Sequence, residues 1–293
     1  MLWNSLKTFL LLSLLTLLLV WIGRMVGGPA GMTIALIMAA IMNLGAYLFG
    51  HKLILWQYNA QPLPEREYRW LYDMTQRLCQ RAGLPMPRLY LIPEMQPNAF
   101  ATGPSPSSGI VAFTAGILQT MNREEIEGVL AHELAHIKNR DMLTMTIAAT
   151  IVGAITWLTD MLRWSLFFRS ARDREEEDNG LGLIIAIVVG IIAAIAATLI
   201  QLAISRTREY EADRTAALMV GRPDGLISAL AKLDSYTKAI PMEQANSATA
   251  HLFIANPFAG AGDWLRELFS THPPIPKRIE RLRQIRGSGY RLA

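Results

Sequence analysis

The sequence contains a single cysteine, Cys79, so no disulfide can form within the chain. This cysteine usage fits a reducing compartment.

The chain has no internal repeat and no low-complexity tract, and its long apolar stretches carry almost no ionisable residue away from their ends. That pattern argues against a transporter, which needs ionisable groups at mid-membrane. The net charge of +4 and the pI near 9.3 come without any nucleic-acid recognition motif, so we expect contact with anionic lipid and no nucleic-acid partner.

A mean hydropathy of +0.25 and a hydrophobic content of 52% predict an integral membrane protein. Four stretches are apolar enough to cross a bilayer: residues 2–22, 30–50, 142–162 and 181–204. The first two are expected to form a hairpin with a Gly27-Gly28-Pro29 turn. No small-x-small cleavage site closes the first stretch, which favours a retained anchor over a signal peptide. Because Asp160 and Arg163 lie near the end of the third stretch, the last two also fit a buried hairpin of helices.

Basic residues predict the orientation. Lys7, Lys52, Arg66, Arg69 and the basic residues after position 204 lie on one side if all four stretches cross, and that side should be cytoplasmic. Residues 163–174 place four arginines on the opposite side, so the charge pattern is not uniform.

The apolar stretches divide the chain into an N-terminal hairpin (1–50), a polar part (51–141), a second hairpin (142–204) and a second polar part (205–293). The two polar parts must meet in space to build one site. Residues 66–82 are predicted to form a helix that Gly83-Leu84-Pro85 ends, and residues 88–92, 99–102 and 110–114 read as strands.

Residues 110–114 are a candidate edge strand beside the site. An unpaired edge binds an extended peptide through main-chain hydrogen bonds, so Ile110, Val111 and Ala112 are predicted to contact substrate. An ordinary hairpin strand packed on a helix fits the same pattern equally well.

The segment from His132 to His136 reads His-Glu-Leu-Ala-His. On a helix, residues i and i+4 project from one face, so both imidazoles can reach one metal ion, with Glu133 beside them as a general base. Asn122 before two glutamates predicts the start of that helix. Two structural histidines are the alternative, but such pairs rarely flank a glutamate in this way.

A catalytic zinc site needs a third protein ligand from another element. After the fourth apolar stretch, Glu209 and Asp213 lie one helical turn apart, and either carboxylate could face the metal. Helix spacing alone does not choose between them.

The chain resembles the HtpX family of membrane zinc endopeptidases in peptidase family M48, which also includes the Ste24 CAAX proteases. The resemblance spans nearly the whole chain and rests on the following residues: 98–103 (Asn-Ala-Phe-Ala-Thr-Gly); His132 to His136 with Asn139 and Asp141; Ser205-Arg206, Glu209-Tyr210 and Ala212-Asp213; and Thr271-His272-Pro273-Pro274 with Arg278-Ile279.

The resemblance implies a mainly α integral membrane protein with about four transmembrane helices and an α+β zincin-like (gluzincin) catalytic domain. It implies one Zn²⁺ per chain held by His132, His136 and Glu209. Glu133 would be the general base and acid, and Asp213 would orient a ligand. Glu211 is expected on a solvated helix face.

Three further residues have two interpretations each. His272 is a candidate oxyanion donor or a structural turn histidine. Asn98 is placed by the resemblance near the substrate edge, or it caps a turn. Asp141 accepts a hydrogen bond from a metal-bound imidazole, or it caps the start of the third apolar stretch.

The function expected from the resemblance is cleavage of misfolded or damaged membrane proteins under stress, at the cytoplasmic face of the bacterial inner membrane, by a multi-pass protein. The partners would be polypeptide substrates and the lipid bilayer, and the sequence sets no oligomeric state. The alternatives are a catalytically inactive membrane scaffold and a protease of lipidated peptides like the Ste24 branch. Residues 241–263 are expected to form a long loop that flanks the cleft.

Overall fold

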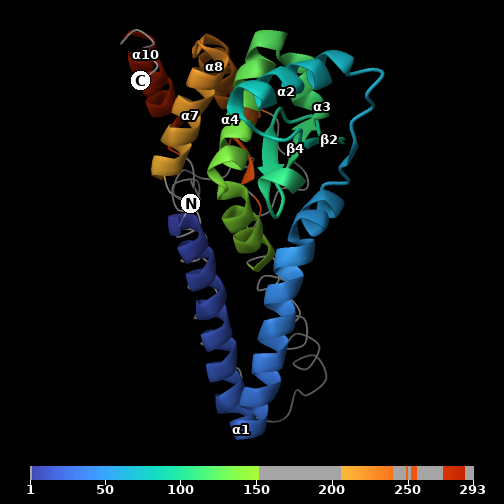
Figure 1. Ribbon diagram of the computed structural model, residues 1–293, viewed down its shortest axis with the longest axis vertical. Coiled ribbons are helices and arrows are strands. Elements are labelled where there is room, and N and C mark those ends of the chain that lie inside the picture. Colours follow the sequence, from blue (N-terminus) through green and yellow to red (C-terminus); the bar gives the residue numbers. More distant parts are fainter. Residues whose placement is uncertain (1, 152–205, 240–248, 250–251, 256–272, 288–293) are drawn as a thin grey trace, which may run out of the picture.

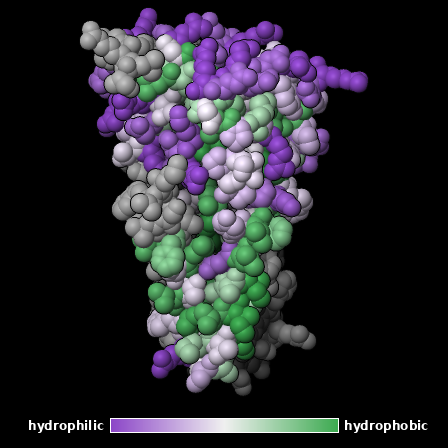
Figure 2. Space-filling view, viewed as in Figure 1, coloured by the Kyte–Doolittle hydropathy of each residue, from purple (hydrophilic) through white to green (hydrophobic). Residues whose placement is uncertain are grey.

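The computed structural model describes residues 2–151, 206–239, 249, 252–255 and 273–287. The fourth apolar stretch, the second half of the third, His272 and most of the 241–263 loop lie outside these described residues. Within them, a helical hairpin occupies one end of the molecule and a mixed helix-and-sheet part the other (Figure 1). Hydrophobic residues gather over the hairpin and hydrophilic ones over the opposite end (Figure 2).

Helix α1 (Leu2–Gln57) is a hairpin whose two arms meet at Gly28 (Figure 1). Gly28 has a φ of 58°, a left-handed conformation that glycine adopts without a Cβ penalty, and Pro29 follows it. The Asn43 amide in the second arm donates to the Leu12 carbonyl at 3.4 Å and to Thr16 Oγ1 at 3.0 Å in the first. The predicted turn at Gly27-Gly28-Pro29 is therefore confirmed.

Among the described residues, the second arm, Gly28–Gln57, is long and apolar enough to cross a bilayer. It continues past the predicted end at residue 50, because its last turns bury Ile54 and Leu55 in a core cluster with strand residues. The helix at Asp141–Ile151, the described half of the third stretch, lies against this arm, and Met145 and Ala149 join the same cluster. The second arm of the hairpin is thus packed directly onto the sheet.

The sheet has four strands in the order β1-β2-β4-β3: β1 (Gln61–Pro62), β2 (Arg88–Ile92), β3 (Ala99–Thr102) and β4 (Ile110–Thr114). Strands β2 and β4 are parallel, whereas β3 is antiparallel to β4 and β1 is antiparallel to β2. The bounds of β2, β3 and β4 agree with the sequence prediction.

The prediction that residues 110–114 form an edge strand is wrong. Strand β4 lies between β2 and β3, so its main chain is paired on both sides, and Ile110, Val111 and Ala112 are fully buried. These residues therefore do not offer a peptide the unpaired edge that was expected. The run of five buried residues is typical of a strand covered on both faces, and β3 takes the outer position.

Helix α4 (Arg123–Asn139) is the centre of the helical layer and contacts β3, β4 and three other helices. The other described helical elements are α2 (Arg69–Ala82), η1 (Pro106–Ser108), α3 (Ala115–Thr120), α7 (Arg206–Val220), α8 (Asp224–Ala239) and α10 (Ile275–Gly287). Helix α2 begins at Arg69 rather than at residue 66, after a main-chain turn from Pro64 to Tyr68. Helices α7 and α8 pack on α4, so the two polar parts of the chain meet there (Figure 1).

The buried carboxylate of Glu125 ties α4 to α8. It accepts the Asn122 N–H at 2.9 Å, closing the predicted capping box, and it accepts Ser228 Oγ at 2.6 Å and Lys232 Nζ at 2.7 Å from α8. Burial alone would raise the pKa of Glu125, but these donors and the Lys232 charge hold the pKa below its usual range.

Replacing this carboxylate by an amide, Glu125→Gln, should lower the free energy of unfolding at pH 7 by about 1.5–3 kcal/mol, the range for hydrogen bonds to a charged group. Because the folded-state pKa is depressed, the contribution is present above the ordinary pKa of 4.5 and is lost as the pH falls through the folded value. The difference between variant and wild type in thermal unfolding should therefore stay nearly constant from pH 7 to about 5 and shrink as the pH is lowered below 4.5.

Glu124→Gln is the matched control. Glu124 is on the same turn but is exposed, and its ion pair with Arg222 is worth less than about 1 kcal/mol. Equal effects of the two substitutions, or a Glu125→Gln effect that does not change with pH, would contradict this account.

Candidate active site

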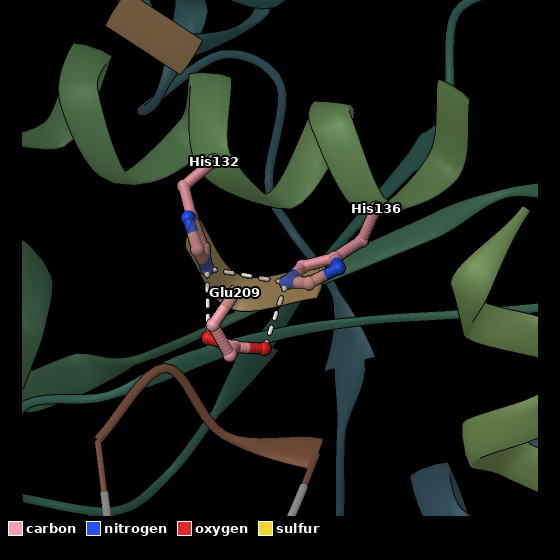
Figure 3. A group of neighbouring side chains, drawn as sticks. All are labelled: His132, His136 and Glu209. Atoms are coloured by element: carbon pink, nitrogen blue, oxygen red, sulfur yellow. Dashed lines mark hydrogen bonds and ion pairs between the residues drawn. The ribbon is translucent and has the colours of Figure 1, made fainter. Parts of the chain in front are cut away.

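Helix α4 presents His132 and His136 on one face, as the i, i+4 spacing predicts. Both side chains are buried, and their Nε2 atoms lie 3.2 Å apart. The two imidazole rings meet edge to face, with centroids 4.7 Å apart. Both ε nitrogens therefore point at one small volume beneath the helix (Figure 3).

Helix α7 brings Glu209 to the same volume (Figure 3). Its Oε2 lies 3.6 Å from His132 Nε2, and its Oε1 lies 3.4 Å from His136 Nε2. The carboxylate is as buried as the two imidazoles. The three donors come from two helices that are distant in the sequence but packed side by side.

The spacing of these three donors fits a metal ion. Ligands about 2.0–2.1 Å from a tetrahedral metal lie about 3.3–3.4 Å from one another, close to the 3.2, 3.4 and 3.6 Å observed. Two imidazoles and one carboxylate make a donor set that suits zinc and other divalent cations. The group could therefore hold one metal ion and leave a coordination position open.

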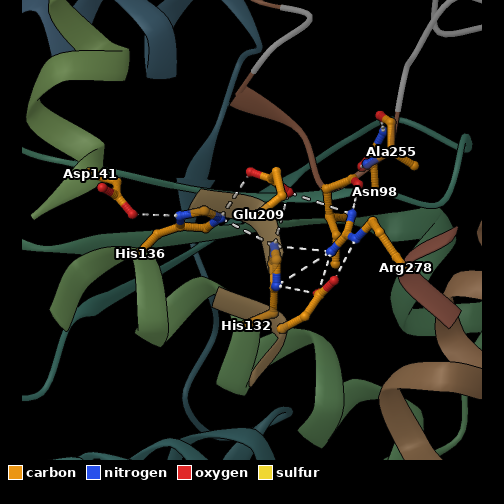
Figure 4. Close-up of polar contacts among 9 residues, drawn as sticks. Asn98, His132, His136, Asp141, Glu209, Ala255 and Arg278 are labelled. Atoms are coloured by element: carbon orange, nitrogen blue, oxygen red, sulfur yellow. Dashed lines mark hydrogen bonds and ion pairs between the residues drawn. The ribbon is translucent and has the colours of Figure 1, made fainter. Parts of the chain in front are cut away.

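Each histidine has a second carboxylate behind it (Figure 4). Asp213 Oδ1 lies 3.0 Å from His132 Nδ1, and Asp141 Oδ2 lies 3.3 Å from His136 Nδ1. An acceptor at Nδ1 favours the tautomer in which the Nε2 lone pair is free for a metal. Asp213 therefore lies where the resemblance implies a residue that orients a ligand, and the position of Asp141 agrees with the first of its two interpretations.

Arg278 of α10 completes this arrangement, although no role was predicted for it from the sequence. Its guanidinium is fully buried and donates to Asp213 from Nε at 2.9 Å and from Nη2 at 2.7 Å. It also lies 3.6 Å from Glu209 Oε2 (Figure 4). A signal was available, because Arg278 stands on the apolar side of α10, one turn before the buried Leu282.

The ion pair fixes the charge on Asp213. Burial alone would raise the pKa of this aspartate, but the charge and hydrogen bonds of Arg278, with those of His132, hold it at about 2. The same contact keeps the pKa of Arg278 above its ordinary value despite burial. Asp213 is therefore an ionised acceptor for His132.

Glu133 follows His132 on α4 and is almost fully buried. Burial raises its pKa, and Glu209 raises it further, whereas His132, His136 and Arg278 act in the opposite direction. A carboxylate with a raised pKa is better matched to proton transfer near neutral pH.

The remaining predicted residues lie elsewhere. Asn98 is fully buried just before β3, and its amide is hydrogen-bonded to both main-chain groups of Ala255 (Figure 4). Ile110, Val111 and Ala112 are in the interior of the sheet and are not part of the metal group. His272 is outside the described residues.

A helix that carries His-Glu-x-x-His, completed by a carboxylate from a later helix, is the site of a metalloprotease. Comparison with known proteins agrees: the profile of peptidase family M48 matches residues 65–286. The chain belongs to peptidase family M48.

Relatives named "Protease HtpX homolog" align over most of the chain. The protein of Syntrophobacter fumaroxidans is 50% identical over 279 residues, covering 95% of this chain and 98% of its own. That of Pyrococcus abyssi is also 50% identical over 279 residues, covering 95% of each chain. The Aquifex aeolicus protein is 51% identical over 267 residues, covering 90% of this chain and 87% of its own.

The crystal structure of S. mikatae Ste24p has a similar fold, with a TM-score of 0.52 at 18% identity. The match covers 95% of this chain and 62% of the Ste24p chain. The family and the relatives support a protease, and among the described residues the second arm of α1 is long and apolar enough to cross a membrane.

Removing the third donor should release the metal. Substituting a residue that hydrogen-bonds a metal ligand weakens metal affinity about 10–100-fold, and we expect Glu209→Gln to weaken it by more than this. The measurement is metal content per chain by mass spectrometry after dialysis against buffers of fixed free zinc. Glu211→Gln is the control, because Glu211 is on the same helix but is exposed. Equal metal content in both variants would rule out Glu209 as a ligand.

Removing the buried guanidinium should destabilise the fold. Arg278→Met leaves Asp213 buried without its partner, and breaking such a pair costs about 3–5 kcal/mol. Arg286→Met, on the same helix, removes an exposed pair with Asp224 and should cost less than about 1 kcal/mol. Thermal unfolding of both variants in detergent measures the difference, and similar melting temperatures would show that the buried pair contributes little.

Proposed function

We propose that this protein is a zinc-dependent endopeptidase of the cytoplasmic membrane that hydrolyses misfolded or damaged membrane proteins at the cytoplasmic face. The observation that carries the proposal is the buried group of His132, His136 and Glu209, with donor spacing that suits a tetrahedral ion and Glu133 on the same helix. A scaffold without activity would not need to retain both the donors and the base.

His132 and His136 would hold zinc through Nε2, and Glu209 through its carboxylate. Bound zinc would supply a Lewis acid that polarises the scissile carbonyl and lowers the pKa of water. Asp213 and Asp141 would accept the Nδ1–H groups and keep both rings in the required tautomer and orientation. Arg278 would act through Asp213, by keeping this acceptor ionised.

Glu133 would carry the proton. Its carboxylate takes a proton from the attacking water as the oxygen adds to the scissile carbonyl carbon. When the carbon–nitrogen bond breaks, Glu133 returns a proton to the leaving amine. The burial that raises its pKa favours both transfers, because a group with a pKa nearer neutrality gains and loses a proton more readily at physiological pH.

The packing of the apolar arm against the catalytic part supports membrane proteins as substrates. The second arm of α1 packs onto the sheet through Ile54 and Leu55, and an arm inserted in a bilayer would hold the metal group near the membrane surface. Lys52, Arg66 and Arg69 follow the apolar part of this arm, and such basic residues favour the cytoplasmic side. Relatives named as HtpX homologues support the same activity.

Glu133→Gln tests the chemistry. The variant should bind as much zinc as the wild type but cleave fluorescein-labelled β-casein, an unfolded substrate, at least about 100-fold more slowly, as for loss of a general base. Both proteins are purified in detergent with chelator and then given zinc, and peptide release and metal content are measured.

Glu127→Gln, on the same helix but partly exposed, is the control and should retain wild-type rates. Cleavage by Glu133→Gln at the wild-type rate would exclude Glu133 as the base. Zinc-loaded wild type that does not cleave β-casein would refute a general endopeptidase.

A further inference from the structure

Residues 252–255 lie along the outer edge of β3, beside the metal group. The Ile254 N–H donates to the Ala99 carbonyl at 3.0 Å, as in a strand pair. The Asn98 side chain just before β3 contacts Ala255, the Ala99 main chain pairs with Ile254, and the Phe100 ring packs on Phe253, so the segment runs in the direction antiparallel to β3. We call residues 252–255 the strap.

The strap also contacts the groups that surround the metal site. Arg278 Nη1 donates to the Ile254 carbonyl at 3.0 Å, while Nη2 of the same guanidinium lies 3.3 Å from His132 Nε2 (Figure 4). The Asn98 amide donates to the Ala255 carbonyl at 2.9 Å and accepts the Ala255 N–H at 3.3 Å. The strap therefore runs between the sheet edge and the residues behind the metal ligands.

Ile254 makes the two main-chain contacts that an extended substrate residue would make in this place. Its N–H pairs with a sheet edge, and its carbonyl accepts from a cation next to a metal ligand. Peptides that bind by adding a strand gain affinity from such main-chain bonds. The edge of β3 is thus already occupied by the chain itself.

We propose that the strap is an intramolecular stand-in for substrate, which an extended polypeptide must displace from β3 before cleavage. The proposal rests on the proposed endopeptidase function. Exchange of strap for substrate replaces the Ile254–Ala99 main-chain hydrogen bond and the contacts of the strap main chain with the Asn98 and Arg278 side chains by equivalent ones, so displacement costs little when the incoming chain is extended. A folded polypeptide cannot offer those bonds, which restricts cleavage to unfolded segments.

The strap is held unequally along its length. Phe253 is fully buried and packs edge to face on Tyr58 and Phe100, with ring centroids 5.1 and 5.2 Å away. Thr249 just before the strap is hydrogen-bonded to Tyr58. Ile254 and Ala255 carry the contacts to Asn98, Ala99 and Arg278. An extended chain can replace the hydrogen bonds of Ile254 and Ala255 but not the ring packing of Phe253, so the strap would open at Ile254 and Ala255 and stay attached at Phe253.

The Ile254 side chain adds a preference among substrates. It is 1% exposed and belongs to the main core cluster, with Ala99. A substrate residue that replaces it enters an apolar environment, so we infer a preference for segments with an aliphatic residue at this position. Exposed apolar segments are what a misfolded membrane protein offers.

Hydrogen exchange tests displacement directly. Zinc-loaded Glu133→Gln protein, which should bind without cleaving, is followed by mass spectrometry with and without saturating β-casein. We expect amides in the strap to exchange at least about tenfold faster when β-casein is bound, as for a locally opened segment, while Ala99 to Ala101 stay protected. Strap protection that is unchanged or increased by bound β-casein would overturn the proposal.

Ile254→Ala provides a second readout. Weakening the internal competitor should tighten β-casein binding at least about fivefold in the Glu133→Gln background, measured by fluorescence anisotropy, because less packing is lost when the strap opens. Ile117→Ala truncates an equally buried isoleucine of the same cluster away from the strap, and it should lower stability without tightening binding. Weaker or unchanged binding by Ile254→Ala would show that the strap is only structural.

The two proposals fail separately. Zinc-dependent cleavage by the wild type, together with a strap that keeps its protection when β-casein binds, overturns the strap proposal alone. Absence of zinc-dependent cleavage overturns the endopeptidase function on which it rests.

Discussion

The buried ion pair between Arg278 and Asp213 is the contact on which the site depends. One guanidinium joins α10 to α7 through Asp213, reaches the His132 ring of α4, and holds the Ile254 carbonyl beside β3. A buried cation of this kind costs much free energy unless it is paired and hydrogen-bonded, and here both aspartate oxygens accept from it. The arrangement of the metal donors and the position of the chain at the sheet edge are therefore set by the same charged group.

Local features of the chain predicted much of the fold. The His-Glu-Leu-Ala-His helix begins at a capping box centred on Asn122, and its bounds follow from residues close in sequence. The strands at 88–92, 99–102 and 110–114 were also read from local pattern. The lateral order of these strands could not be predicted in this way. Strand β3 runs antiparallel to β4 and pairs with it on the side away from β2, and this arrangement depends on contacts between residues distant in sequence. The wrong assignment of Ile110 to an exposed edge has this cause.

The candidate site was likewise predictable only where the residues concerned are close in the sequence. Helix spacing placed Glu209 and Asp213 on one face but could not rank them, and the structure puts them at the two nitrogens of one ring: Glu209 near Nε2 of His132, Asp213 at Nδ1. Arg278 had a detectable signal, a charge on the apolar side of a helix. Residues 252–255 had none, because a short segment that pairs with β3 from more than a hundred positions away leaves no periodicity to read.

The metal donors are divided between two parts of the chain that the ribosome makes at different times. His132 and His136 are made first, whereas Glu209, Asp213 and Arg278 follow only after the long segment that begins at residue 142 has been synthesised. A nascent chain that has released α4 alone holds two histidines and a glutamate but no third donor. The hydrolytic centre therefore cannot assemble before the segment that carries Glu209, Asp213 and Arg278 has been synthesised, so the earlier parts of the chain are not exposed to its activity until then.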